Sequence, residues 1–384
     1  MTPFIDSDEH IIILDMPAGA LSVDDLKRLR ETGIKTCWGW VNWFSTEPRR
    51  GDYQWAVTDF VVERMVAAGM KLILTVPNAG PTFAPDDWYL RTYDGHLWRA
   101  YYDGYREGWP YSELSPWNAE AMAYERNFQR MVRDRYAASG LVQCVAGGVH
   151  GGEAIVPGMT ESWFDKSAVE SFRSYALAAF NGDLEYFNGA NHSAYAGWSE
   201  VRPGMFPDRA AMALQLTTTD WLHDTLMQVL ADRHRVFAEQ PWRESWVMLP
   251  QRNTEFAEVY ETGPRSCNWL APELYRALPE ALGTTLQIML YEVFRPSGTQ
   301  GALDAIKGYE GCTWVGSQFI QGLQRHTYGA IAQGLRGFLC GPVHPESGCQ
   351  KLTPEMLQVI AWSLREWGKE EIPWLSQKKN YVTG

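Results

Sequence analysis

The feature that most constrains the fold of this 384-residue chain is a junction that recurs along it. Each junction has an amphipathic helix, a glycine, and then a short run of apolar and β-branched residues. The glycines are Gly33, Gly69, Gly140 and Gly334. Glycine just after a helix adopts the left-handed backbone that ends it, and the apolar run that follows is typical of a strand buried on both faces. Alternating helices and strands predict a parallel sheet with right-handed crossovers.

Eight segments have the length and composition of strands. They are Ile11–Leu14, Ile34–Trp40, Lys71–Val76, Leu141–Val149, Trp246–Leu249, Leu286–Tyr291, Ala305–Tyr309 and Arg336–Cys340. Eight parallel strands joined by helices close into a barrel. No linker rich in proline or serine divides the chain, so we expect residues 1–384 to form a single α/β domain, a (β/α)8 TIM barrel with long βα loops.

Two glutamates follow predicted strands in backbone suited to a ligand. Glu153 ends the glycine-rich run that starts at Gly147, and Glu310 follows the predicted strand Ala305–Tyr309. The carboxyl ends of barrel strands form the active-site face, and two carboxyl groups are the minimum equipment for cleaving a glycosidic bond. We therefore predict that Glu153 and Glu310 are catalytic. Glu292 replaces Glu310 in this role if the strand count is wrong by one.

Composition narrows the class of partner. The net charge of −12 and the lack of a basic patch argue against a nucleic-acid or anionic-membrane surface. The chain has 18 tryptophans, many in the long predicted loops, residues 78–118 and 181–209. Aromatic faces stack on sugar rings, and the alternative is that these rings fill the layer between the barrel and its helices. We expect an oligosaccharide or polysaccharide substrate.

The termini and cysteines point to an intracellular enzyme without a metal. Residues 1–9 contain no basic region followed by an apolar core, so we expect a cytoplasmic protein. The six cysteines are scattered without metal-ligand spacing, which predicts buried free thiols and no zinc site. We expect no metal or organic cofactor, and the sequence leaves homo-oligomerisation open.

Several stretches resemble one known family, the retaining β-galactosidases of glycoside hydrolase family 42, over residues 34–345. The matching stretches are Trp43–Pro48, Gly51–Trp55, Val76–Ala79, Tyr93–Gly95, Ser115–Pro116, Ser171–Tyr175, Leu184–Asn188, Trp198–Val201, Asp220–Trp221 and Tyr328–Gly337. The resemblance implies a β-linked, galactose- or glucose-like substrate and a two-step retaining reaction. It matches Glu153 to the family's acid/base and Glu310 to its nucleophile.

The sequence departs from the family just before the acid/base. The family's clan has asparagine there, which bonds the sugar 2-hydroxyl, whereas this chain has Gly152. Asn78, His150 or Asn118 could supply that contact, although His150 suits a structural role equally well. We expect three aromatic residues to complete the substrate-binding set. They are Trp43, Tyr309 and Trp314.

Two alternatives remain at this stage. The run from Gly152 through Glu153 to Pro157 is also similar to β-amylases, which share the barrel but invert the anomeric configuration. An inverting enzyme separates its carboxyl groups by about 6.5–9.5 Å, against about 5–5.5 Å in a retaining one. The second alternative is a barrel that binds sugars without cleaving them.

Overall fold

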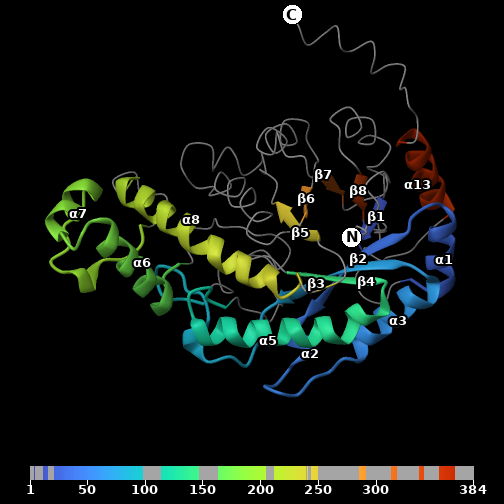
Figure 1. The fold of residues 1–384 in the computed structure, drawn as a ribbon, viewed down its shortest axis with the longest axis horizontal. Coiled ribbons are helices and arrows are strands. Elements are labelled where there is room, and N and C mark those ends of the chain that lie inside the picture. Colours follow the sequence, from blue (N-terminus) through green and yellow to red (C-terminus); the bar gives the residue numbers. More distant parts are fainter. Residues whose placement is uncertain are drawn as a thin grey trace, which may run out of the picture.

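Eight parallel strands form the centre of the protein. The structure, a computed structural model, describes residues 4, 12–15, 21–97, 114–146, 163–204, 212–238, 240, 244–249, 285–290, 313–317, 337–340 and 354–367. The strands are β1 (Ile12–Asp15), β2 (Thr36–Asn42), β3 (Lys71–Ala79), β4 (Val142–Ala146), β5 (Glu244–Leu249), β6 (Thr285–Leu290), β7 (Thr313–Ser317) and β8 (Gly337–Cys340). Figure 1 shows them gathered between the helices.

The strand order is that of a barrel. Hydrogen-bonded neighbours run β4-β3-β2-β1-β8-β7-β6-β5, and every pair is parallel. β1 pairs with β8, and the two end strands of this order, β4 and β5, are also in contact. The predicted TIM barrel is thus confirmed.

The structure describes eight helices, and some of them contact the strands. They are α1 (Val23–Glu31), α2 (Trp43–Thr46), α3 (Ala56–Ala68), α5 (Ala119–Tyr136), α6 (Lys166–Ala179), α7 (Leu184–Asn191), α8 (Met212–Arg235) and α13 (Pro354–Trp367), with 3-10 turns η1 (Asp86–Trp88), η2 (Ala137–Ser139) and η3 (Trp198–Glu200). In Figure 1, α8 runs from α6 and α7, at one end of the molecule, toward the strands. None of the described helices has the length and hydropathy needed to span a membrane.

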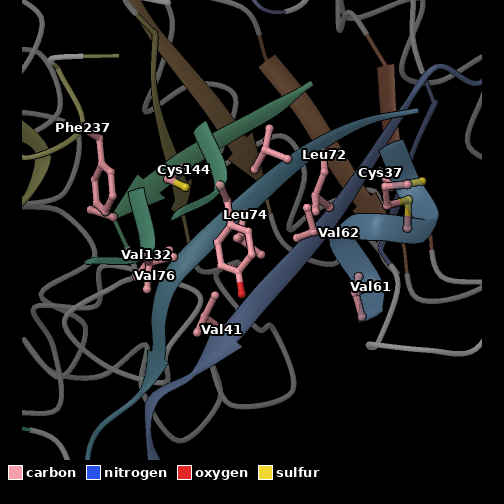
Figure 2. Close-up of a cluster of buried hydrophobic side chains, with 14 of the residues drawn as sticks. Cys37, Val41, Val61, Val62, Leu72, Leu74, Val76, Val132, Cys144 and Phe237 are labelled. Atoms are coloured by element: carbon pink, nitrogen blue, oxygen red, sulfur yellow. The ribbon is translucent and has the colours of Figure 1, made fainter. Parts of the chain in front are cut away.

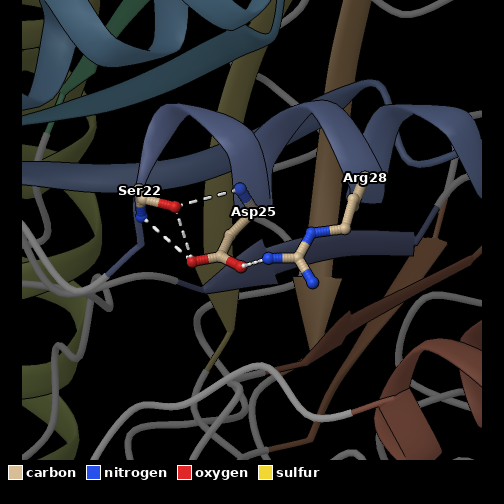
Figure 3. A network of polar contacts seen from close by, with 3 residues as sticks. All are labelled: Ser22, Asp25 and Arg28. Atoms are coloured by element: carbon tan, nitrogen blue, oxygen red, sulfur yellow. Dashed lines mark hydrogen bonds and ion pairs between the residues drawn. The ribbon is translucent and has the colours of Figure 1, made fainter.

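The first helix begins where its sequence predicts. The Ser22 hydroxyl accepts a hydrogen bond from the backbone N–H of Asp25 at 3.1 Å, and the Asp25 carboxylate accepts one from the backbone N–H of Ser22. This reciprocal capping box satisfies N–H groups that the first turn leaves free. Figure 3 shows the motif extended by Arg28, which donates to Asp25 at 2.6 Å.

The glycine junctions are confirmed where the structure describes them. Gly33, Gly69 and Gly140 all have positive φ, at 105°, 68° and 70°. At Gly69, the left-handed residue that ends α3, an added Cβ would lie 2.9 Å from the Arg30 guanidinium. Any other residue there would combine backbone strain with a close contact. Gly334 lies outside the described residues.

The core lies between the strands and their covering helices. Figure 2 shows Leu72, Leu74 and Cys144 of β3 and β4 in one buried cluster with Val132 of α5 and Phe237. Cys37 and Cys144 are free and buried, as expected for structural thiols. Burial raises the pKa of the Cys37 thiol to about 12, which keeps it protonated and unreactive.

The seventh strand was predicted in the wrong place. The sequence favoured Ala305–Tyr309, which lies outside the described residues, whereas the strand that pairs with β6 and β8 is β7, Thr313–Ser317. Both segments are short apolar runs, and periodicity over five residues does not distinguish a strand from its neighbours. The other seven predicted strands overlap the observed ones.

The side chain of Gln240 makes hydrogen bonds to the backbone of β4 of the kind that a neighbouring strand makes. The Gln240 carbonyl accepts a hydrogen bond from the backbone N–H of Cys144 at 2.8 Å, and its amide N–H donates to the Cys144 carbonyl at 2.7 Å. Gln240 is buried and comes shortly before β5 in the chain. The side-chain amide of Gln240 therefore satisfies both the backbone N–H and the backbone carbonyl of Cys144.

We predict that Gln240→Ala destabilises the protein. The change leaves a buried backbone donor and acceptor without partners, each at a cost of about 1–3 kcal/mol. Urea unfolding measures the loss. Gln228→Ala is the control, because Gln228 is exposed and its side-chain amide donates to Asp232, four positions along the same helix. Equal unfolding midpoints for the two variants would contradict this role of Gln240.

A second prediction concerns acid stability. His234 is 3% exposed near the end of α8, and desolvation, with a smaller contribution from Arg233, lowers its pKa from 6.5 to about 4. As the pH falls, the unfolded chain takes up the proton before the folded one does. His234 therefore leaves the free energy of unfolding unchanged above pH 6.5. Between pH 6.5 and about 4 it lowers that free energy by about 3 kcal/mol.

Unfolding free energies across this pH window test the assignment. His234→Leu should flatten the pH dependence between 6.5 and 4 relative to the wild type. His96→Gln serves as the control, because the His96 side chain is 67% exposed. If His234→Leu retains the full slope, another group causes the acid sensitivity.

Candidate active site

The predicted site residues divide into described and undescribed ones. Glu153, His150, Tyr309 and Glu310 lie outside the described residues, as does the rival Glu292. Their position along the chain is nevertheless fixed relative to described strands. Glu153 follows the last residue of β4, Ala146, by seven positions.

The corrected position of β7 changes the context of Glu310. Glu310 precedes the first residue of β7 by three positions, so it leads into that strand and does not follow it. No aspartate or glutamate occurs between Ser317, where β7 ends, and Gly337, where β8 begins. Glu292, in contrast, follows the last residue of β6, Leu290, by two positions. In a parallel barrel the carboxyl ends of all strands meet at one face.

Trp314 also changes its context. It was expected in a loop after the seventh strand, four residues beyond Glu310. Its backbone instead forms the second residue of β7, paired with Met289 and Gly337. This place near the beginning of β7 is not beyond the carboxyl end of a strand, and the role of Trp314 as a sugar platform stays a prediction.

Asn78 lies at the expected end of its strand. It is the second-last residue of β3, and the next residue, Ala79, pairs with Asn42 at the end of β2. Both asparagines thus belong to the carboxyl-end edge formed by these two neighbouring strands.

Trp43 is buried beneath this edge. It follows β2 directly, is 0% exposed, and stacks with Tyr124 and with Phe128 of α5 at centroid distances of 5.8 and 4.7 Å. Its indole N–H donates to the Glu47 carboxylate at 2.7 Å. Buried in this way, Trp43 supports the loop from below and offers no open face to a sugar in this structure.

Glu47 is the centre of a buried network of hydrogen bonds. Its carboxylate is 0% exposed and accepts from the Trp43 indole, from the backbone N–H of Gly51 at 2.7 Å and from the hydroxyl of Tyr124. Burial and the charge of the Glu47 side chain raise the pKa of Tyr53. Burial and the Glu47 carboxylate raise the pKa of Tyr124, so its hydroxyl remains a donor.

Asn118 caps a helix. Its side-chain oxygen accepts from the backbone N–H of Ala121 at 3.0 Å, and its amide N–H donates to the carbonyl of Asp87 at 3.2 Å. Both ends of the side chain are therefore used to begin α5 and to hold the loop after β3. This use competes with the sugar contact predicted for Asn118.

Trp163, the first described residue after residues 147–162, is buried against other aromatic rings. Trp163 is 0% exposed and meets Trp117 edge-on at 5.1 Å, while Trp117 stacks on Trp221 of α8 at 4.5 Å. The backbone N–H of Phe164 bonds the Arg91 carbonyl at 3.1 Å. The segment that carries Glu153 thus runs between the end of β4 and this aromatic cluster.

Asp165 follows Phe164 and is the N-cap residue of α6. Its carboxylate caps α6 by accepting from the backbone N–H of Ala168 at 3.0 Å, and burial raises its pKa.

Among the described residues, no group of three or more His, Cys, Asp or Glu side chains is placed to hold a metal ion.

Eight parallel strands in this closed order form the (β/α)8 barrel, a fold that glycoside hydrolases share with many other enzymes. The sequence model of glycoside hydrolase family 42, described as beta-galactosidase, matches residues 19–229. The chain belongs to this family. Its substrate is accordingly a carbohydrate.

Solved structures give the same fold at low sequence identity. The catalytic domain of β-amylase from Paenibacillus polymyxa is similar at 13% identity and a TM-score of 0.69, over 94% of this chain and 98% of that one. A β-galactosidase from Marinomonas ef1 matches at 13% identity and a TM-score of 0.66, over 97% of this chain but 61% of that one. One from Halorubrum lacusprofundi matches at 15% identity and a TM-score of 0.64, over 94% and 58%. The chain therefore spans about three fifths of these galactosidases. No curated protein sequence matches.

The sequence did not reveal how Glu47 is used. Glu47 belongs to the family-like stretch Trp43–Pro48, and its burial supports a structural role. Its partner Tyr124 lies 77 positions away in the chain. No local spacing rule connects residues so far apart, so the network became visible only with the packing of α5 against the loop after β2.

We predict that Asn118→Ala lowers the free energy of unfolding by about 1 kcal/mol, the usual cost of losing a helix cap. Asn118→Ser should recover most of this loss, because serine also accepts from the first helical turn. Chemical denaturation of both variants measures the difference. Equal stability of the alanine and serine variants would show that the capping bond contributes nothing.

Proposed function

We propose that the protein hydrolyses a β-linked glycoside of galactose- or glucose-like configuration by a two-step retaining reaction. The observation that carries the proposal is the match to family 42 together with carboxylates just beyond the ends of β4 and β6. In the first step a carboxylate attacks the anomeric carbon while the protonated acid/base gives its proton to the departing glycosidic oxygen. In the second step the acid/base takes a proton from water, which attacks the same carbon and frees the nucleophile.

Glu153 is proposed as the acid/base, as the sequence predicted. For the nucleophile the choice lies between Glu310, the first expectation, and Glu292. The bounds of β6 and β7 support Glu292, because it follows a strand whereas Glu310 precedes one. Two residues of extended chain span at most about 7 Å, which keeps Glu292 close to the carboxyl end of β6.

Asn78 is proposed to contact the sugar 2-hydroxyl in place of the clan's asparagine, which is Gly152 here. Its position at the end of β3 supports this role, and the hydrogen bonds of Asn118 make that residue the weaker candidate. His150 and Tyr309 remain candidates from the sequence. The net charge of −12 supports a neutral sugar over a nucleic acid as partner.

An inverting, β-amylase-like reaction is the second candidate. The chain spans 98% of a β-amylase catalytic domain, and the run Gly152 to Pro157 is similar to the β-amylase pattern. In that reaction the second carboxylate activates water directly, and no covalent intermediate forms. The anomer of the first-formed product distinguishes the two, because retention requires two displacements and inversion only one.

We predict that Glu153→Gln and Glu292→Gln each lower kcat on an activated aryl β-glycoside by about 10²-fold or more, while Glu310→Gln stays within about twofold of the wild type. Steady-state kinetics measure the rates, and NMR follows the product anomer. Thermal unfolding of each variant controls for folding. Loss of activity in Glu310→Gln with full activity in Glu292→Gln would restore the first assignment. Binding of sugars by the wild type without any turnover would indicate the non-catalytic barrel.

A further inference from the structure

The Glu47 carboxylate has an unusual set of partners for a buried charge. Its hydrogen bonds come from N–H and O–H donors: the Trp43 indole, the Gly51 backbone and the Tyr124 hydroxyl. Both oxygens of a carboxylate can accept hydrogen bonds from these donors. In glutamine, which has the same shape, an NH2 group replaces one oxygen and would face other donors. The shell thus distinguishes Glu from Gln at this position, although the two have the same shape.

The donors come from separate segments. Trp43 and Gly51 belong to the segment that follows β2, and Tyr124 lies near the beginning of α5, 77 positions after Glu47. The Glu47 carboxylate therefore ties α5 to the loop that leaves the carboxyl end of β2. The backbone N–H of Gln54 also returns to the carbonyl of Thr46, at 2.6 Å, which closes this loop on itself.

The Tyr124 ring also contacts aromatic residues of the loop after β3. Trp88 and Phe83 of that loop lie 5.7 and 6.0 Å from Tyr124 between ring centroids. The Arg50 guanidinium, from the β2 loop, lies 5.0 Å from the Tyr124 centroid and 5.6 Å from that of Trp88. The backbone N–H of Ser115 bonds the Trp88 carbonyl at 2.7 Å, which joins the far end of the β3 loop to the same point.

We propose that Glu47 and Tyr124 form a positioning pair that holds the loops after β2 and β3 in the arrangement that binds the sugar. The inference rests on the proposed glycosidase function, since the loops after barrel strands build the active-site face. Glu47 is buried and does not touch substrate, so it acts through the backbone it holds. Its removal raises KM and leaves kcat, which depends on the two catalytic carboxylates, nearly unchanged.

The same helix provides a matched control. Tyr136, at the other end of α5, donates its hydroxyl to the Asp59 carboxylate of α3 at 2.8 Å. That bond also joins α5 to a carboxylate 77 positions away, but at the end of the helix that leads toward the start of β4. Tyr136→Phe therefore removes an equivalent hydroxyl–carboxylate bond away from the loops after β2 and β3.

The experiment compares Glu47→Gln, Tyr124→Phe, Tyr136→Phe and the wild type, each well below its unfolding temperature. We expect Glu47→Gln and Tyr124→Phe to raise KM for an aryl β-glycoside about tenfold, which corresponds to about 1.4 kcal/mol, with kcat within twofold. Tyr136→Phe should lower the unfolding temperature while leaving KM unchanged. Hydrogen exchange of peptides covering residues 80–97 should accelerate in the first two variants only.

The outcomes separate the two proposals. Unchanged KM and unchanged exchange in Glu47→Gln and Tyr124→Phe would overturn the positioning role, as would an equal KM increase in Tyr136→Phe. If the wild type cleaves no glycoside, the proposed function fails. In that case exchange in residues 80–97 and oligosaccharide binding decide the role of the pair: faster exchange with weaker binding supports it, and no change in either overturns it.

Discussion

The barrel of parallel strands, hydrogen-bonded from β4 round to β5, is the constraint on which the rest of this structure depends. Because every strand runs in the same direction, each carboxyl end opens on one face, and a residue's place just before or just after a strand decides which face it serves. Gln240 shows how strictly the backbone of the barrel must be satisfied, since its amide bonds both the N–H and the carbonyl of Cys144. The chemistry at the face relies on this frame.

Aromatic rings connect the frame to the loops. Trp43, Phe128 and Tyr124 stack beside the carboxyl end of β2, and Trp117, Trp163 and Trp221 gather where the segment bearing Glu153 returns. Trp43, Trp117, Trp163 and Trp221 thus pack against other aromatic rings, which agrees with the alternative interpretation that some tryptophans are structural. They still serve the site, because a loop held from below keeps its polar groups in place.

The success of the sequence predictions depended on how local their signals were. The cap at Ser22 and the glycines that follow α1, α3 and η2 depend on neighbours within a few residues, and the structure confirms them. The seventh strand failed because two short apolar runs competed within Ala305–Ser317, and only pairing with β6 and β8 selected the second. That selection moved support for the nucleophile from Glu310 to Glu292.

The sequence by itself determined the alternation of helix and strand, the barrel and the family, because periodicity, capping and motif order are written along the chain. Only the tertiary structure decided which strand each carboxylate follows and what Glu47, Trp43 and Asn118 contact. The physical reason is distance along the chain. A bond between Glu47 and Tyr124 forms across 77 positions only after the strands have paired and α5 has packed on them.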